Sequence, residues 1–444
     1  MPAALIDKET RLEDRFIAAF EQHEGLSLNG SHAGLRRLRK EALGHFATLG
    51  FPARKAEAWK YTNIGKILKR PYTLPFGPSE APVSRSDVAP LLIDGLDAHV
   101  AVFVNGHFSA ALSRLDDLPE GVLITGLAHA AETHTALVDA HLARYADYEG
   151  RAFIALNTAF TKDGAFVYVP RHTVVEKPVH VIDLVTTREE ALVQPRTLVV
   201  AEENTQVKLI QSLRTLATTP TFINAVTEVF VGDHAQVDRY EIQDEPAHTS
   251  MVTALNGYQQ TGSVFRNSTF TFGGEVIRNN INILPDAEHC ETHLYGLFLA
   301  DGAMHVDNHT LVDHARPNCF SNEFYKGVLD DRATGVFNGK VLVRQDAQQT
   351  NAYQSNKSIV LTDTAHMYAK PELEIYADDV KCSHGATTGQ LDDEALFYLR
   401  TRGLTPQRAR ALLLVSFARD VLENVAIEPL HETLDAMVTA RFSD

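Results

Sequence analysis

Positive charge, cysteine and tryptophan are scarce in this sequence. The 444 residues include 41 basic against 57 acidic side chains, for a formal net charge of -16, with only three cysteines and one tryptophan. An odd number of cysteines without the spacing of a disulfide framework fits a reducing compartment. The excess negative charge repels the phosphates of nucleic acids and anionic lipid headgroups, so we expect neither as a partner.

Targeting signals and several catalytic motifs are also missing. The N-terminal residues show no basic region followed by an apolar run, and no stretch approaches the roughly 18 apolar residues that a membrane span needs. We therefore expect a cytoplasmic protein. The sequence has no Gly-x-Ser-x-Gly, no Walker loop and no strand-linked Gly-x-Gly-x-x-Gly, so acyl transfer, nucleotide hydrolysis and dinucleotide binding lack their usual carriers.

The hydrophobic pattern divides the chain into three parts. Residues 1–95 carry short helical patterns and then a proline-rich crossing, residues 96–385 are mostly strand-like, and residues 386–444 are helical again. A helical interlude is expected near 133–148. The apolar run at 153–160 is expected to be a strand, because it is followed by turn residues and further β-type runs.

The strand-like part has a long repeat. After a hairpin predicted at Asn105-Gly106, a small or apolar residue follows a polar turn at Val207, Ala235, Val264 and Ala287. The steps are 28, 29 and 23 residues (235−207, 264−235 and 287−264), so the repeat is loose. Such steps are typical of a flattened β-solenoid, in which each coil adds one strand to each of two facing parallel sheets. A β-sandwich of hairpins is the alternative, but few hairpin dipeptides follow, so the spacing favours the solenoid.

Two groups of metal-binding residue types stand out. His305, Asp307 and His309 alternate, so on a strand they would share a face and suit a metal ion; a solvated strand face would look the same, and we favour it. Cys382 and His384 also alternate, which places a thiol and an imidazole on one face about 7 Å apart. A buried thiol beside a satisfied histidine is the plainer interpretation. Two ligands are too few for a closed metal site, so a partner would have to supply the others.

Other functions stay open at this point. A β-solenoid polysaccharide enzyme would need stacked carboxylates, for which Asp346, Asp363 and Asp378 are the candidates near turns. A purely structural solenoid that forms a homodimer through its exposed terminal strands is a third hypothesis. The C-terminal helices would either cap the open core or present a docking surface.

The segment Lys370–Leu404 carries a resemblance to a known family. KPELEIYADDVKCSHGATTGQLDDEALFYLRTRGL closely resembles the C-terminal signature of the SufB/SufD family of the SUF iron–sulfur cluster assembly system. The form of this signature and the few cysteines are those of SufD rather than of the paralogue SufB. Further similarity, which extends the resemblance over nearly the whole chain, lies in RKAEAWKYT, LNTAFTKDGAFVYVP and HVDNHTLVDHARPNCFSNEFYKGVLDDRATGVFNGKV.

The resemblance implies both a fold and a role. It implies a mainly β protein, with a right-handed parallel β-helix core between helical domains, acting as a non-catalytic scaffold of the SufBCD complex. The helices near 391–424 would dock the ATPase SufC. His384 matches a histidine proposed to bind iron or a nascent cluster at the SufB interface, with Cys382 as its neighbour, and SufB would supply the other ligands. The resemblance leaves open whether the complex binds a reduced flavin.

Overall fold

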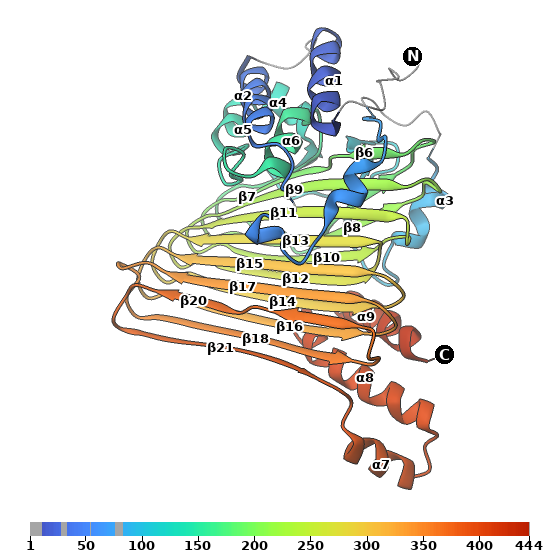
Figure 1. The fold of residues 1–444 in the computed structure, drawn as a ribbon. Helices are drawn as coiled ribbons and strands as arrows, with labels where there is room; N and C mark the ends of the chain where they lie inside the picture. The colour runs from blue at the N-terminus through green and yellow to red at the C-terminus, as the bar shows by residue number, and fades with distance from the viewer. Residues whose placement is uncertain (1–10, 28–32, 54, 76–82, 444) are drawn as a thin grey trace.

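The computed structural model describes residues 11–27, 33–53, 55–75 and 83–443. Two long sheets face each other, with helices near both ends of the stack (Figure 1). Most neighbouring strands within each sheet are parallel, and successive long strands of the chain alternate between the two sheets. The fold is mainly β and forms a solenoid of about 8 turns, which confirms the architecture predicted from the repeat.

In the described part of the chain the two sheets have ten and eleven strands, and two strands of the second sheet lie off its main path. The first sheet consists, in spatial order, of β2 (His107–Phe108), β1 (His99–Val104), β5 (Val179–Val185), β8 (Gln206–Thr215), β10 (Gln236–Asp244), β12 (Val264–Gly273), β14 (Glu291–Ala300), β16 (Phe320–Leu329), β18 (Thr350–Val360) and β21 (Val380–Gly389). The second consists of β19 (His366–Ala369), β17 (Thr334–Val343), β15 (His305–His314), β13 (Val276–Pro285), β11 (Thr249–Gln259), β9 (Thr221–Val231), β7 (Arg196–Ala201), β4 (Ala165–Val169) and β3 (Leu123–Gly126), with β20 (Glu372–Ile375) beside β17 and β6 (Ala191–Val193) beside β9.

The parallel register sets the length of one coil. Gln236 lies beside Val264 and Val264 beside Glu291, so successive coils take 28 and 27 residues (264−236 and 291−264). Because side chains alternate along a strand, residues in register form columns that point either into the solenoid or outward. Val237 and Phe265 form part of one such inward column in the apolar core.

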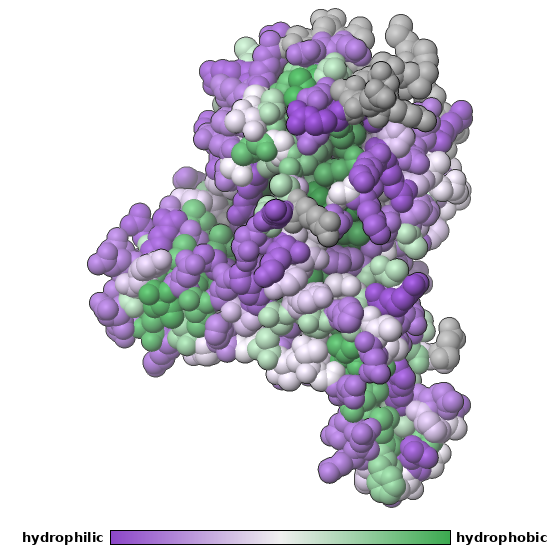
Figure 2. All heavy atoms as spheres, viewed as in Figure 1, coloured by the Kyte–Doolittle hydropathy of each residue, from purple (hydrophilic) through white to green (hydrophobic). Residues whose placement is uncertain are grey.

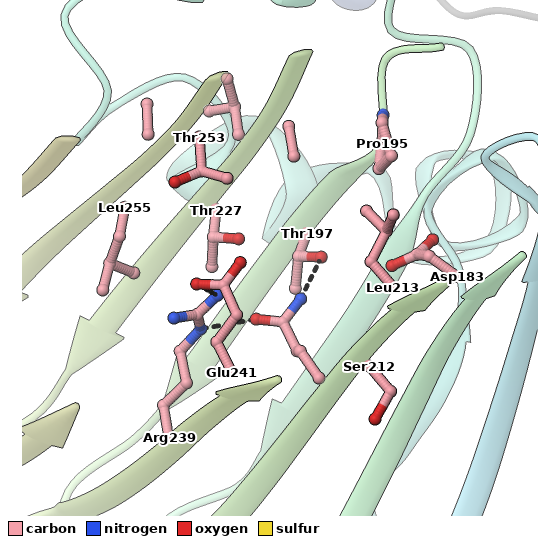
Figure 3. A pocket seen from close by; sticks show the side chains of 14 residues that line it. Asp183, Pro195, Thr197, Ser212, Leu213, Thr227, Arg239, Glu241, Thr253 and Leu255 are labelled. Carbon is pink, nitrogen blue, oxygen red and sulfur yellow. Dashed lines mark hydrogen bonds and ion pairs between the residues drawn. The ribbon is translucent and has the colours of Figure 1, made fainter. Parts of the chain in front are cut away.

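The interior also holds polar side chains. Figure 3 shows a cavity between the sheets where Arg239 Nε donates to Gln211 Oε1 at 2.5 Å and Gln211 Nε2 donates to Thr197 Oγ1 at 3.1 Å. Arg239 also forms an ion pair with Glu241 at 3.0 Å. Asp183 lines the same cavity, where burial, and then the negative charge of Glu241, raises the pKa of its carboxyl to about 7.

Five N-terminal helices gather at one end of the solenoid (Figure 1): α1 (Leu12–Ser27), α2 (Ala33–Leu49), α4 (Leu127–Thr133), α5 (Thr135–His141) and α6 (Ala152–Phe160). The short helix α3 (Arg85–Val88) lies apart from them and packs against β1 and β5. Short 3-10 turns lie at Glu57–Trp59, Ile64–Lys69 and Ala89–Leu91. The hairpin predicted at Asn105-Gly106 is confirmed, since Phe103 pairs with Phe108. The predicted helical interlude begins earlier than expected, with α4, and its helices end at His141. Part of the predicted proline crossing, residues 76–82, lies outside the described residues.

The strand predicted at 153–160 is wrong, because these residues form α6. All of them are buried, so the run is apolar on every side and its periodicity does not distinguish helix from strand. Tertiary contacts decide the outcome. Asn157 Nδ2 donates to the backbone oxygens of Pro195 and Asn224 at 3.0 and 2.8 Å, which ties the helix to the start of the second sheet.

The C-terminal helices are α7 (Asp393–Thr401), α8 (Pro406–Leu422) and α9 (Glu428–Phe442). α8 and α9 pack on the outer face of the first sheet through an apolar cluster that includes Leu297, Leu414 and Leu434. Lys326 of β16 donates to the backbone oxygen of Phe417 at 2.9 Å and forms an ion pair with Asp420. These two helices therefore cover the side of the solenoid and leave its last strand, β21, uncovered, so they do not cap the core. No helix in the described ranges has the length and apolar character needed to cross a membrane.

Candidate functional site

The last strand of the first sheet, β21, has a neighbour on one side only. It pairs in parallel with β18 over its whole length, from Val380 beside Thr350 to Gly389 beside Ile359. On its other side no described strand pairs with it, and most of its residues are exposed. An unpaired edge offers a row of free backbone N–H and C=O groups to an incoming strand.

Both candidate ligands, Cys382 and His384, lie on this edge strand. Cys382 packs with Ala352 and Ala377 in the small apolar cluster at this end of the core, so its face of β21 is the inward one. His384 follows two residues later and shares that face. It is exposed, whereas Cys382 is partly buried. The structure therefore brings the two residues to one face but gives them different environments.

These environments favour His384 as the accessible ligand. Burial raises the pKa of the Cys382 thiol, and a thiol must lose its proton before it binds a metal. A neutral imidazole already carries a free lone pair on one nitrogen. Within the described ranges, no three His, Cys, Asp or Glu side chains lie close enough to hold a metal ion. Any metal at His384 therefore needs ligands from elsewhere.

Two polar side chains that the sequence analysis did not single out lie behind His384. In register, Gln354 lies beside His384 and Glu323 beside Gln354, at steps of 30 and 31 residues (384−354 and 354−323). Both are buried. Burial raises the pKa of Glu323 to about 7, although Thr310 and Gln354 act to lower it. The coil repeat was the signal that would have found this column by counting back from His384.

The His305, Asp307 and His309 cluster is not a solvated face, so that prediction is wrong. The N-terminal segment crosses the outer face of the second sheet here: Thr62 Oγ1 lies 2.9 Å from His305 Nε2 and donates to Asp307. Asp307 is fully buried and forms an ion pair with Arg278 at 2.8 Å. Burial acts to raise the pKa of Asp307, yet the charges of Arg278 and His309 hold it at about 2. The cluster attaches the N-terminal segment to the solenoid.

The carboxylates proposed for a polysaccharide enzyme do not share a groove. Asp346 precedes β18 and Asp363 follows it, so the 11 residues of this strand separate them by about 36 Å at roughly 3.3 Å per residue. Asp378 lies just before β21, at the same end as Asp346. This arrangement speaks against a stacked carboxylate site.

Fold and site together define a class: a β-solenoid protein whose last coil ends in an open edge strand bearing an accessible histidine. A family model described as "SUF system FeS cluster assembly, SufBD core domain" matches residues 184–417, and one described as "SufBD protein N-terminal region" matches residues 10–181. The chain therefore belongs to the SufBD family of iron–sulfur cluster assembly proteins.

Similar proteins are found in several bacteria. The chain is 32% identical to an iron–sulfur cluster assembly SufBD family protein of Synechocystis, over 91% of this chain and 90% of that one. It is 28% identical to SufD of Escherichia coli, with 88% and 89% covered, and 26% identical to SufD of Bacillus subtilis, with 91% and 93% covered. The chain is thus SufD-like over nearly its whole length.

Proposed function

We propose that this chain is the non-catalytic SufD-type scaffold subunit of a SufBCD complex, and that His384 contributes a ligand to iron or to a nascent iron–sulfur cluster at the interface with SufB. The observation that carries the proposal is the exposed imidazole of His384 on the unpaired strand β21. Family membership supports the class of function. Cys382 is the half-buried neighbour on the same face.

The open edge explains how a second subunit would complete the site. A strand added to β21 would lie about 4.8 Å away, so its side chains in register with His384 would come within reach of the same metal ion. A single imidazole from this chain holds iron only in combination with those ligands. If β21 and the strand of the second subunit separated, the metal site would lose some of its ligands and bind more weakly. Weaker binding suits a cluster that is transferred to an acceptor protein.

The exposed apolar side chains of the C-terminal helices support the proposal that SufC docks on them. α7 projects away from the solenoid, and Figure 2 shows apolar residues on the surface of this projecting part. Phe397 and Tyr398 of α7 are 67% and 62% exposed, and Leu412 of α8 is 46% exposed. Large exposed aromatic side chains are enriched at protein–protein interfaces. We assign this surface to the ATPase.

The test is the iron content of the assembled complex. We expect the His384→Ala complex, purified anaerobically with SufB and SufC, to keep its subunits but to lose bound iron and sulfide, and cells carrying it to lose cluster supply. Ser383→Ala, on the outward face of the same strand, is the matched control and should retain iron. Equal iron in His384→Ala and wild type would contradict the ligand role and leave a purely structural solenoid.

A further inference from the structure

Three polar atoms behind His384 make no hydrogen bond of normal distance and angle within the described structure, although the side chain of Gln354 lies close enough to Glu323 to act on its pKa. They are Oε1 and Nε2 of Gln354 and Oε1 of Glu323. Gln354 is 3% exposed and Glu323 is fully buried. Buried polar atoms are almost always paired, because leaving them unpaired loses their hydrogen bonds to water without replacement. Because Glu323, Gln354 and His384 are neighbours in register, these atoms can form hydrogen bonds with one another along the column.

The surroundings of Gln354 restrict where its amide can turn. It faces Gly339 of β17, where an added Cβ would lie 2.5 Å from Gln354 Nε2, so the amide occupies space that only glycine leaves free. Along its own sheet, Gln354 has Glu323 on one side and His384 on the other. Neighbouring strands lie about 4.8 Å apart, a spacing that a side-chain amide bridges by hydrogen bonds to both stacked neighbours.

We propose that Gln354 orients the imidazole of His384. The ring N–H of His384 donates to Gln354 Oε1, and Gln354 Nε2 donates to Glu323 Oε1, which uses all three unpartnered atoms. The carboxylate of Glu323 is already held from the other side, because Thr310 Oγ1 donates to its Oε2 at 2.5 Å. Gln354 and Glu323 are thus positioning residues, and their relevance to iron rests on the proposed function of His384.

This arrangement has a defined chemical consequence. A histidine whose one ring nitrogen donates to a fixed acceptor keeps its proton there, so the other nitrogen carries the free lone pair. The fixed nitrogen lies toward the core, on the side of Gln354, and the lone pair lies away from it. The lone pair therefore faces the open edge, where the strand of a partner would arrive.

The first test measures the tautomer of His384 without any metal. In the isolated full-length chain at pH about 8.5, where histidine side chains are normally neutral, we expect widely separated ¹⁵N chemical shifts for the two ring nitrogens, assigned by their loss in His384→Ala. Gln354→Leu removes the acceptor and should bring the two shifts together. Gln354→Glu retains an acceptor oxygen and should keep them apart. Averaged shifts in the wild-type chain, or unchanged shifts in Gln354→Leu, would overturn the proposal.

Asn356→Leu is the matched control. Asn356 lies on the same face of β18, is 1% exposed and has an unpartnered Nδ2, but its neighbour in register is Ala386 rather than His384. This variant disturbs the core to a similar extent and should leave the His384 shifts unchanged. If it merges the shifts as Gln354→Leu does, the effect is a general disturbance of the last coil and the proposal fails.

The second test separates the positioning role from the ligand role. Partners behind a metal-binding histidine typically change metal affinity 10–100-fold, so anaerobic Fe²⁺ titration of the SufBCD complex should show a loss of about 10-fold or more in Gln354→Leu and near wild-type affinity in Gln354→Glu. Suppose that Gln354→Leu changes the tautomer of His384 as expected but that the His384→Ala complex keeps its iron. The proposed hydrogen bonds are then supported, and the proposed role of His384 as an iron ligand is contradicted. Wild-type Fe²⁺ affinity in Gln354→Leu, in a complex where His384→Ala loses iron, would overturn the positioning role.

Discussion

At the scale of single residues, burial decides the chemistry of groups that the sequence presents as alike. Cys382 and His384 are two residues apart, yet Cys382 lies in an apolar cluster and His384 is exposed. The carboxyls of Asp183 and Asp307 are both buried. Asp307 has a cation beside it and a pKa of about 2, while Asp183 has the negative charge of Glu241 nearby and a pKa of about 7.

Asp183 makes stability depend on pH in a definite direction. Its pKa rises from 3.8 to about 7 on folding, so between these values the folded chain holds a proton that the unfolded chain has lost. The bound proton stabilises the folded chain, so the contribution of Asp183 to the free energy of unfolding is present at low pH and is lost as the pH rises toward 7. We expect Asp183→Asn to flatten the decrease in unfolding temperature between pH 5.5 and 7.5, measured by differential scanning calorimetry. Asp94→Asn, an exposed control, should behave as wild type, and an unchanged pH profile in Asp183→Asn would contradict the assignment.

At the scale of elements, one segment of the N-terminal part is attached to strands far away in the sequence. The guanidinium carbon Cζ of Arg278 lies 3.8 Å from the centre of the Trp59 ring. Its Nη1 donates to the backbone oxygen of Ala58 at 2.8 Å. Tyr61 stacks on Tyr368 of β19 with ring centres 4.7 Å apart. These contacts join the segment to the middle and to the last coil of the second sheet.

Arg278 contacts both the crossing segment, at Ala58, and the buried carboxylate of Asp307. We expect Arg278→Met to cost about 3–5 kcal/mol of unfolding free energy, because it removes the guanidinium group from the buried carboxylate of Asp307. Limited proteolysis should then cut earlier near Trp59. Arg344→Met is the control, since the Arg344 ion pair with Asp313 is half exposed and pairs of this kind contribute about 0–1 kcal/mol. Equal losses in chemical denaturation of the two variants would argue against a special role for the buried pair.

The helix α7 allows a sharper test of docking than removal of the C-terminal part. Truncation after Gly389 would also remove α8 and α9 and expose the apolar sheet face that they cover. We expect the double variant Phe397→Ala and Tyr398→Ala to weaken SufC binding at least 10-fold in calorimetric titration without lowering the unfolding temperature. Tyr376→Ala, 64% exposed on the solenoid, should bind normally. Full SufC affinity in the double variant would exclude this surface as the docking site.

At the scale of the whole molecule, the first sheet ends in a strand, β21, that no described strand pairs with on its outer side. With β21 unpaired, we expect the isolated chain to form a homodimer, with twice its mass of 49.0 kDa in light scattering. Lysines on an edge strand oppose pairing, so Ser383→Lys with Thr387→Lys should yield monomers and also reduce association with SufB. A wild-type chain that is monomeric at high concentration, or a lysine variant that still dimerises, would refute pairing through β21.

Local patterns in the sequence predicted the solenoid and the strand that carries the candidate site. The coil repeat, the hairpin at Asn105-Gly106 and the alternation of Cys382 with His384 are local patterns, and local patterns are what a sequence displays directly. The same patterns suggested the two parallel sheets and the helical C-terminal part. They left open what covers each face.

Which faces are covered and which polar groups meet depends on contacts between residues far apart in the sequence. Thr62 and Asp307 are 245 residues apart, so no spacing rule connects them. The cluster of His305, Asp307 and His309 was therefore predicted to face solvent, whereas in the structure it binds the N-terminal segment. The run at 153–160 became a helix because contacts on all sides decided between two structures that its apolar composition allows equally. Glu323, Gln354 and His384 form one column because parallel register brings residues a coil apart to the same place.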